Sequence, residues 1–347
     1  MRSTTTPVTA LLSALVLLVG CQQQNAETIS AFRFDEASMP AAKPWTSLDF
    51  KNDPEDFQFA VIGDRTGGAD HRGIFDRAMD QLNLLQPEFV INVGDLIEGY
   101  SNDRAKLASQ WDEVDGMLSK LEMPLFRTVG NHDLSNDTMV EVWRERHGPT
   151  YYHFVYRDVL FLVLNSEDPP RSAPEDIEEK IELYNRLQRE DPEKAKKMLD
   201  EFMAAVASDL GKPANFSDEQ VAYVEGALAK HPEVRWTFLF LHEPAWKNPS
   251  ENFLALEKLL QDRSYTFFAG HLHYYDIQER FGRDYITMGP AGASFHKNGP
   301  GNVDHISWVT MTENGPRIGQ ITLDGVYDRA GRDLEVKELY NREREEN

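Results

Sequence analysis

Short apolar segments recur along the chain from Phe57 onward, and most of them end in small or polar residues. Each segment has the length of a strand and is rich in β-branched or aromatic side chains, as buried strands are. The segments are 57–62, 89–93, 125–129, 159–164, 236–241 and 265–269. Apolar residues at helical spacing between the first three segments predict helices within 74–85 and 107–118. This alternation favours an α/β fold in which helices cover a sheet.

Three further strand-like runs follow in the last part of the chain. They lie at 285–288, 305–311 and 317–321 and are joined by short turns, such as Asn314-Gly315. Two stacked mixed sheets flanked by helices account for the whole pattern.

One stretch, 168–215, interrupts this rhythm. It holds two helical patterns, 177–187 and 198–205, which Asp191-Pro192 separates. The faces away from the two apolar stripes are dense in charged residues. We therefore expect a helical insertion with a solvated charged face. A lid over a substrate site is the alternative, because long insertions are often functional.

The first 20 residues have the pattern of a signal peptide, with one early positive charge and an apolar run over 8–19. That run is too short to span a bilayer comfortably. Residues 18–21, Leu-Val-Gly-Cys, resemble the bacterial lipobox, which implies cleavage before Cys21 and its lipidation. An ordinary secretory signal with a chance cysteine is the alternative. We expect a lipoprotein of the bacterial cell envelope that touches the membrane only through its lipid, and Gln22 favours the outer membrane or periplasm over the inner membrane.

The predicted organisation has four parts. After the signal peptide 1–20, the lipidated cysteine and a polar, Pro-punctuated tether occupy 21–56. One domain, 57–330, carries the insertion, and a charged tail occupies 331–347.

Charge and cysteine content exclude several functions. The chain has 58 Asp and Glu against 36 Lys and Arg, a net charge of −22, so bulk binding to nucleic acid is disfavoured. A single cysteine excludes an intrachain disulfide and thiolate metal sites.

Polar motifs follow five of the predicted strands. They are Gly63-Asp64-Arg65-Thr66, Gly94-Asp95, Gly130-Asn131-His132-Asp133, His242-Glu243 and Gly270-His271-Leu272-His273. Because the carboxyl ends of parallel strands meet at one sheet edge, these side chains should converge. Carboxylate, amide and imidazole ligands without sulfur suit zinc, manganese or iron.

Taken in order, the motifs Asp, Gly-Asp, Gly-Asn-His-Asp, His and Gly-His-x-His resemble those of the calcineurin-like metallophosphoesterases over about residues 57–290. The resemblance implies a four-layer αββα sandwich and two divalent or trivalent metal ions, manganese, iron or zinc. It also implies a distribution of ligands, with Asp64 and His273 on one metal, Asn131, His242 and His271 on the other, and Asp95 bridging both.

The resemblance further implies roles for two neighbouring residues. His132 would lie near the substrate phosphate and donate to a phosphoryl oxygen or to the leaving group, and Asp133 would orient its imidazole. The expected reaction is in-line attack by a metal-bridging hydroxide on a phosphate mono- or diester.

One motif departs from the family pattern. Where the family has Asp-x-His, this chain has Asp64-Arg65-Thr66, and a threonine hydroxyl is at best a weak metal contact. His71, in the following loop, is a candidate replacement, with an exposed loop histidine as the alternative. Arg65 is a candidate catalytic residue that contacts phosphate bidentately, unless it pairs with an acidic neighbour.

The sequence therefore predicts a hydrolase of phosphate esters that acts on a small molecule or another phosphorylated substrate. The alternative is a degenerate, non-catalytic lipoprotein that uses the same fold for binding at the cell envelope. A Gly-rich segment, 290–296, which ends at His296, is either a substrate loop or a simple turn.

Overall fold

The computed structural model describes residues 55–325 except 68–69, 71, 172, 175, 211, 297–298 and 324, and it omits the side chains of 206–210. The predicted signal peptide, the lipidation of Cys21, almost all of the tether, the charged tail and His71 lie outside the described residues.

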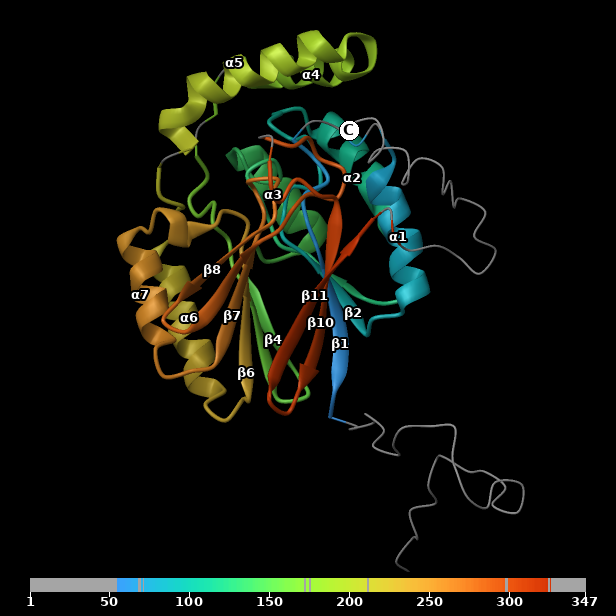
Figure 1. Ribbon diagram of the computed structural model, residues 1–347. Helices are drawn as coiled ribbons and strands as arrows, with labels where there is room; N and C mark the ends of the chain where they lie inside the picture. The colour runs from blue at the N-terminus through green and yellow to red at the C-terminus, as the bar shows by residue number, and fades with distance from the viewer. Residues whose placement is uncertain are drawn as a thin grey trace, which may run out of the picture. The chain divides into compact units, whose positions relative to one another are not determined.

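Two mixed sheets lie face to face at the centre of the domain (Figure 1). The first sheet has the order β11-β10-β1-β2-β3, with β1 (Phe57–Ile62), β2 (Phe89–Asn92), β3 (Leu125–Phe126), β10 (His305–Thr312) and β11 (Gly315–Thr322). The second has the order β4-β5-β6-β7-β9-β8, with β4 (Tyr152–Tyr156), β5 (Val159–Val163), β6 (Trp236–Phe240), β7 (Tyr265–Ala269), β8 (Asp276–Arg280) and β9 (Arg283–Thr287). In the first sheet β1, β2 and β3 run parallel, and β10 and β11 are added by antiparallel pairings. In the second sheet β5, β6, β7 and β9 run parallel, and the edge strands β4 and β8 pair antiparallel.

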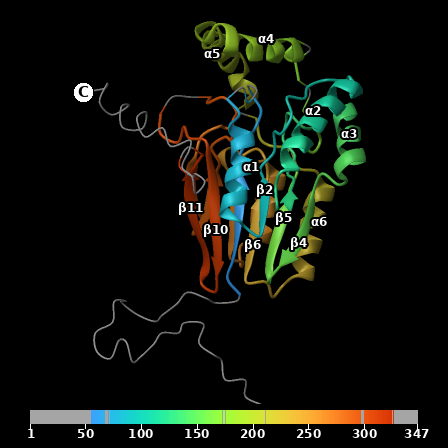
Figure 2. The same cartoon turned by 90° about the vertical axis from the view of Figure 1, so that its right-hand side faces the viewer.

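Helices cover the outer face of each sheet (Figure 2). The first sheet packs against α1 (Ile74–Leu85), α2 (Arg104–Leu118) and α3 (Asp137–His147). The second packs against α6 (Asp218–Lys230) and α7 (Glu251–Leu259), and a short 3-10 helix, η1 (Ala245–Lys247), precedes α7. The predicted four-layer αββα sandwich is confirmed.

Alternation along β1 shows why this sequence builds two layers of core. Phe57, Phe59 and Val61 pack into the aromatic core between the sheets, whereas Ala60 and Ile62 pack against the helices. All five side chains are fully buried. A strand covered on both faces therefore reads as a continuous apolar run.

Two strands were not predicted. β4 and β8 lie at the two edges of the second sheet, and each pairs with one neighbour only. Their residues are half-buried or exposed, so they lack the apolar run by which buried strands are recognised.

The predicted insertion holds two helices, α4 (Ile177–Glu190) and α5 (Pro192–Leu210), which form a hairpin. The hairpin lies beyond the end of the sheets at which β1, β2, β6 and β7 finish (Figures 1 and 2). Among the described residues, no helix is both long and apolar enough to span a bilayer. The boundaries 57–330 and 168–215 stay predictions.

Candidate metal centre

Loops after strands of both sheets bring carboxylates and imidazoles together. Two groups of possible metal ligands form: Asp95 with His242 and His271, and Asp64 with Asp95 and His273. Within each group the ligand atoms lie within 4.8 Å of one another. Asp95 belongs to both groups, so it lies between two potential cation sites.

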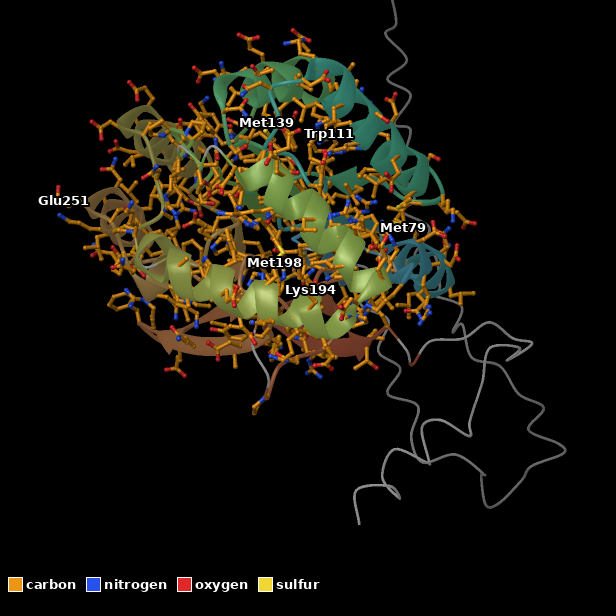
Figure 3. The ribbon with its side chains drawn as sticks, turned by 90° about the horizontal axis from the view of Figure 1, so that it is seen from above. Met79, Trp111, Met139, Lys194, Met198 and Glu251 are labelled. Carbon is orange, nitrogen blue, oxygen red and sulfur yellow. The ribbon has the colours of Figure 1, made fainter. Side chains whose placement is uncertain are left out.

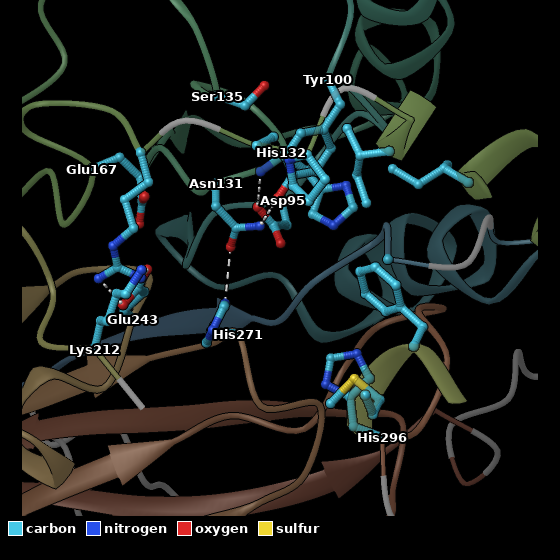
Figure 4. A pocket seen from close by; sticks show the side chains of 18 of the residues that line it. Asp95, Tyr100, Asn131, His132, Ser135, Glu167, Lys212, Glu243, His271 and His296 are labelled. Carbon is cyan, nitrogen blue, oxygen red and sulfur yellow. Dashed lines mark hydrogen bonds and ion pairs between the residues drawn. The ribbon is translucent and has the colours of Figure 1, made fainter. Parts of the chain in front are cut away.

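The first group includes an amide, and its contacts constrain the ring of His242. Nδ1 of His242 lies 2.9 Å from the Val93 carbonyl oxygen, which can only accept, so Nδ1 carries the hydrogen. Nε2 then has only a lone pair in the neutral ring, yet it lies 2.9 Å from Asn131 Oδ1 and 3.1 Å from Asp95 Oδ2. Nδ1 of His271 also lies 2.9 Å from Asn131 Oδ1 (Figure 4). Three acceptor atoms face one another here, an arrangement that calls for a cation or an added proton.

The second group has the same organisation. Nδ1 of His273 donates to the Ser294 carbonyl oxygen at 2.5 Å, and Nε2 lies 3.3 Å from Asp64 Oδ2. The backbone N–H of His271 donates to the same carboxylate oxygen at 2.8 Å. Asp64 Oδ1 is buried and has no hydrogen-bond partner in the described part of the chain. An orphaned buried oxygen beside a fixed imidazole nitrogen suits a metal ion.

The backbone around the centre adopts unusual conformations and packs closely against the ligand candidates. Asp95, His271 and His273 have positive φ angles of 56°, 69° and 51°, a region that non-glycine residues rarely adopt. A Cβ on Gly130 would lie 2.2 Å from Asp95 Oδ1, so only glycine fits there. Such strain concentrates at functional sites.

Charge interactions within the centre shift several pKa values. Burial raises the pKa of Asp95, but the adjacent imidazoles, first that of His242, outweigh burial and hold it below its usual range. Burial lowers the pKa of His242, and the Asp95 carboxylate more than reverses this, so it lies well above its ordinary value. The pKa of His273 is likewise raised, because Asp64 outweighs burial. Burial lowers the pKa of His271 to about 4.

Comparison with known proteins shows which family the chain belongs to. The model of the calcineurin-like phosphoesterase family matches residues 57–275. The chain belongs to the calcineurin-like phosphoesterase family. The predicted resemblance is thus confirmed, and membership supports a hydrolase that acts on phosphate esters.

Individual relatives are more distant. The chain is 28% identical over 149 residues to serine/threonine-protein phosphatase CPPED1 of Rattus norvegicus, covering 38% of this chain and 47% of that protein. The chain therefore spans about half the length of that relative. It is 23% identical to the Homo sapiens protein of the same name, covering 76% and 74%. A dimetal phosphatase from Danio rerio is 17% identical with a TM-score of 0.49, covering 77% of this chain and 99% of that one.

Thr66, which stands where the family has a histidine, has a structural partner. Its buried hydroxyl lies 2.9 Å from the Asp95 carbonyl oxygen and 2.8 Å from that of Ile97, and it donates to them. The side chain thereby ties the loop after β1 to the loop after β2. Its prediction as a weak metal contact gains no support from these contacts.

Arg65 pairs with residues outside the candidate metal centre, so its prediction as a catalytic residue gains no support from its contacts. Its guanidinium donates to Glu113 Oε1 at 2.5 Å and to the Leu96 carbonyl oxygen at 3.0 Å. Arg65 is also not among the residues that line the cavity beside the centre. Pairing with an acidic neighbour, the alternative, is what the structure shows.

The hydrogen bonds of Asp133 do not involve the His132 imidazole, so the expected orienting role gains no support. Its buried carboxylate accepts from the backbone N–H groups of Asp95, Leu96, Ile97 and Gly130 at 2.8–3.3 Å. It therefore shapes the loop that carries Asp95. Burial, and next the charge of Asp95, raise the pKa of Asp133 to about 7.

His132 is oriented by the backbone instead. Its ring Nδ1 donates to the Glu98 carbonyl oxygen at 2.9 Å, and its backbone N–H donates to Asp95 Oδ1 at 2.9 Å. In the neutral ring Nε2 then carries no hydrogen, and the side chain lines the cavity (Figure 4).

Two residues near the centre were not predicted as site residues. The Asn131 amide nitrogen donates to the Tyr100 hydroxyl at 2.6 Å, which turns Oδ1 toward the histidines. The ring of His296 stacks on that of His273, with centroids 3.8 Å apart, and both line the cavity. No motif marks Tyr100, whereas His296 ends the Gly-rich segment 290–296.

Proposed function

We propose that this protein is a metal-dependent phosphoesterase that hydrolyses phosphate mono- or diesters. The observation that carries the proposal is the set of acceptors around His242 Nε2, which only a cation or an extra proton reconciles. Family membership adds the chemistry of phosphate esters.

The ligands divide between two metal ions, manganese, iron or zinc. Asp64 and His273 hold one ion, and Asp95 holds both. Asn131, His242 and His271 hold the other. The hydrogen bonds from Nδ1 of His242 and His273 to backbone carbonyls support these assignments, because such bonds fix the tautomer that leaves Nε2 for a metal.

When bound, two such metals activate a water molecule and neutralise phosphate oxygens. The chain's own residues complete the reaction. His132, held by the Glu98 carbonyl oxygen, presents Nε2 to the cavity, and in its protonated form it donates to a phosphoryl oxygen or to the leaving group. The fixed backbone around Asp95 holds the ligands in place, so little reorganisation is needed during the reaction.

Asp95→Asn tests the proposal, because it removes the charge that both sites share. We expect the metal content of the purified protein to fall below that of the wild type and turnover of p-nitrophenyl phosphate with Mn²⁺ to fall by at least about 10²-fold. Asp137→Asn, at an exposed position on α3, is the matched control. Unchanged metal content with wild-type turnover would remove Asp95 from the centre. Absence of metal and of turnover in the wild type, across Mn²⁺, Zn²⁺ and Fe²⁺, would favour the non-catalytic binding protein.

We also propose that the protein is a lipoprotein of the bacterial cell envelope, attached through Cys21. The signal-like segment and the lipobox-like tetrad support this. In a bacterial host fed labelled fatty acid, the wild type should incorporate label and sediment with membranes, and Cys21→Ser should not. Equal labelling of both proteins would refute the assignment.

A further inference from the structure

A cavity of about 740 Å³ lies against the metal centre, and its two walls differ in chemistry. One wall is polar and consists of groups of the centre, including Asp95, Asn131, His132, His271 and His273. The other wall is supplied by the α4–α5 hairpin and is mostly apolar, with Ile177, Ile181, Tyr184, Met198, Leu199, Phe202 and Met203.

The apolar wall follows from the spacing of residues on the two helices. Ile177, Ile181 and Tyr184 recur every three or four residues on α4, so they share one face. Met198 and Phe202 do the same on α5. Beside this stripe α5 carries an exposed charged face, where the ion pair Lys197–Glu201 has side chains that are 77% and 69% exposed. The hairpin thus turns its apolar stripe to the cavity, and from above it lies across the domain (Figure 3).

The hairpin is held on two sides. Lys106 on α2 contacts Glu178 and Glu182 of α4 at 2.7 and 2.5 Å. On the other side, Tyr184 and Gln188 donate to Ser294 Oγ at 2.9 and 2.5 Å. The carbonyl of the same Ser294 holds His273. Through Ser294, the hairpin is therefore tied to the loop that positions His273, a proposed metal ligand.

We propose that this cavity binds the apolar group of an amphiphilic phosphate ester. The phosphate would lie at the polar wall and an aliphatic chain beneath the hairpin. This rests on the proposed phosphoesterase function and specifies its substrate class. A volume of about 740 Å³ corresponds to roughly 25 water molecules at ~30 Å³ each, far more than a phosphate group needs. Methionine side chains are flexible and adapt to chains of varied shape.

Three polar groups near the hairpin side of the cavity are engaged with other residues, which disfavours a polar substrate such as a phosphopeptide. Arg171 pairs with Glu243 at 2.9 Å, and Lys180 pairs with Asp176 at 2.7 Å. The Tyr184 hydroxyl is engaged with Ser294. A peptide backbone beneath the hairpin would thus lose its hydration and meet mainly side chains without hydrogen-bonding groups.

A substrate series tests the proposal with the full chain and Mn²⁺. Glycerol phosphate, butyl phosphate, octyl phosphate and a phosphoserine peptide are compared by kcat/KM. A fully buried methylene is worth about 0.8 kcal/mol, or roughly fourfold, so octyl phosphate should exceed butyl phosphate by at least about tenfold even with partial burial. Binding of octylphosphonate, measured by calorimetry, should likewise be at least about tenfold tighter than that of butylphosphonate.

Neighbouring residues on α5 provide a matched pair of variants. Phe202→Ser should remove most of the kcat/KM preference for octyl over butyl phosphate, whereas Glu201→Ser should leave that preference unchanged. Phe202→Leu, which keeps an apolar side chain, should retain the preference and shows that the hairpin tolerates substitution.

The outcomes separate this proposal from the proposed function. Equal kcat/KM for butyl and octyl phosphate, or a peptide preferred over both, would overturn the substrate class and leave the phosphoesterase in place. Absence of turnover for all four substrates, together with absence of bound metal, would overturn the proposed function itself.

Discussion

Replacing Asp133 by asparagine gives the sharpest test of how this centre is built. The carboxylate accepts two backbone hydrogen bonds on each oxygen: Asp95 and Gly130 donate to Oδ2, and Leu96 and Ile97 donate to Oδ1. An amide has only one oxygen. Whichever way it is turned, its NH₂ group faces two backbone N–H groups that have lost their acceptor.

The expected magnitude follows from burial. Asp133 is fully buried, so the two N–H groups gain no water in exchange. A buried donor left without a partner costs about 1–3 kcal/mol, so Asp133→Asn should lower stability by roughly 2–6 kcal/mol. A domain of this kind has about 5–15 kcal/mol in total, so the loss should be large.

Thermal and urea unfolding at pH 8, with and without Mn²⁺, measure this loss. Asp137→Asn removes an exposed carboxylate from the first turn of α3 and should cost at most about 1 kcal/mol. Asp133→Asn should also weaken metal binding, because the Asp95 loop loses its anchor. If instead both variants unfold alike and only turnover falls in Asp133→Asn, then Asp133 acts through His132 and the structural role is wrong.

Two further predictions concern the ligands. Tyr100→Phe removes the acceptor at 2.6 Å from the Asn131 amide and should weaken metal affinity about 10–100-fold. Unchanged affinity in a competition titration against a chromophoric chelator would contradict this. The pKa values of His242 and His273 are raised, so without metal both rings stay protonated up to a higher pH than usual, and a metal must displace these protons. Metal affinity should therefore rise with pH. Calorimetry of metal binding at pH 7 in two buffers of different ionisation enthalpy should detect the release of about one to two protons. If no protons are released, the rings are already neutral without metal.

The sequence by itself determined the strands of the core and the ligand candidates. β1 and β7 were predicted with their observed bounds, because a doubly covered strand is a continuous apolar run. Polar motifs at strand ends then named the residues that converge, since parallel strands finish at one edge. The edge strands β4 and β8 left no such run and were missed.

Only the tertiary structure decided what each polar side chain faces. Arg65 and Asp133 stand beside ligand candidates in the chain, yet one turns to Glu113 and the other to four backbone N–H groups. Apart from the hydrogen bond from Gly130, these contacts join residues more than 30 positions apart, so no local spacing encodes them. The same holds for the hairpin. Its apolar stripe could be predicted from the sequence. Its position over the cavity beside the candidate metal centre depends on the packing of elements that are distant in the chain.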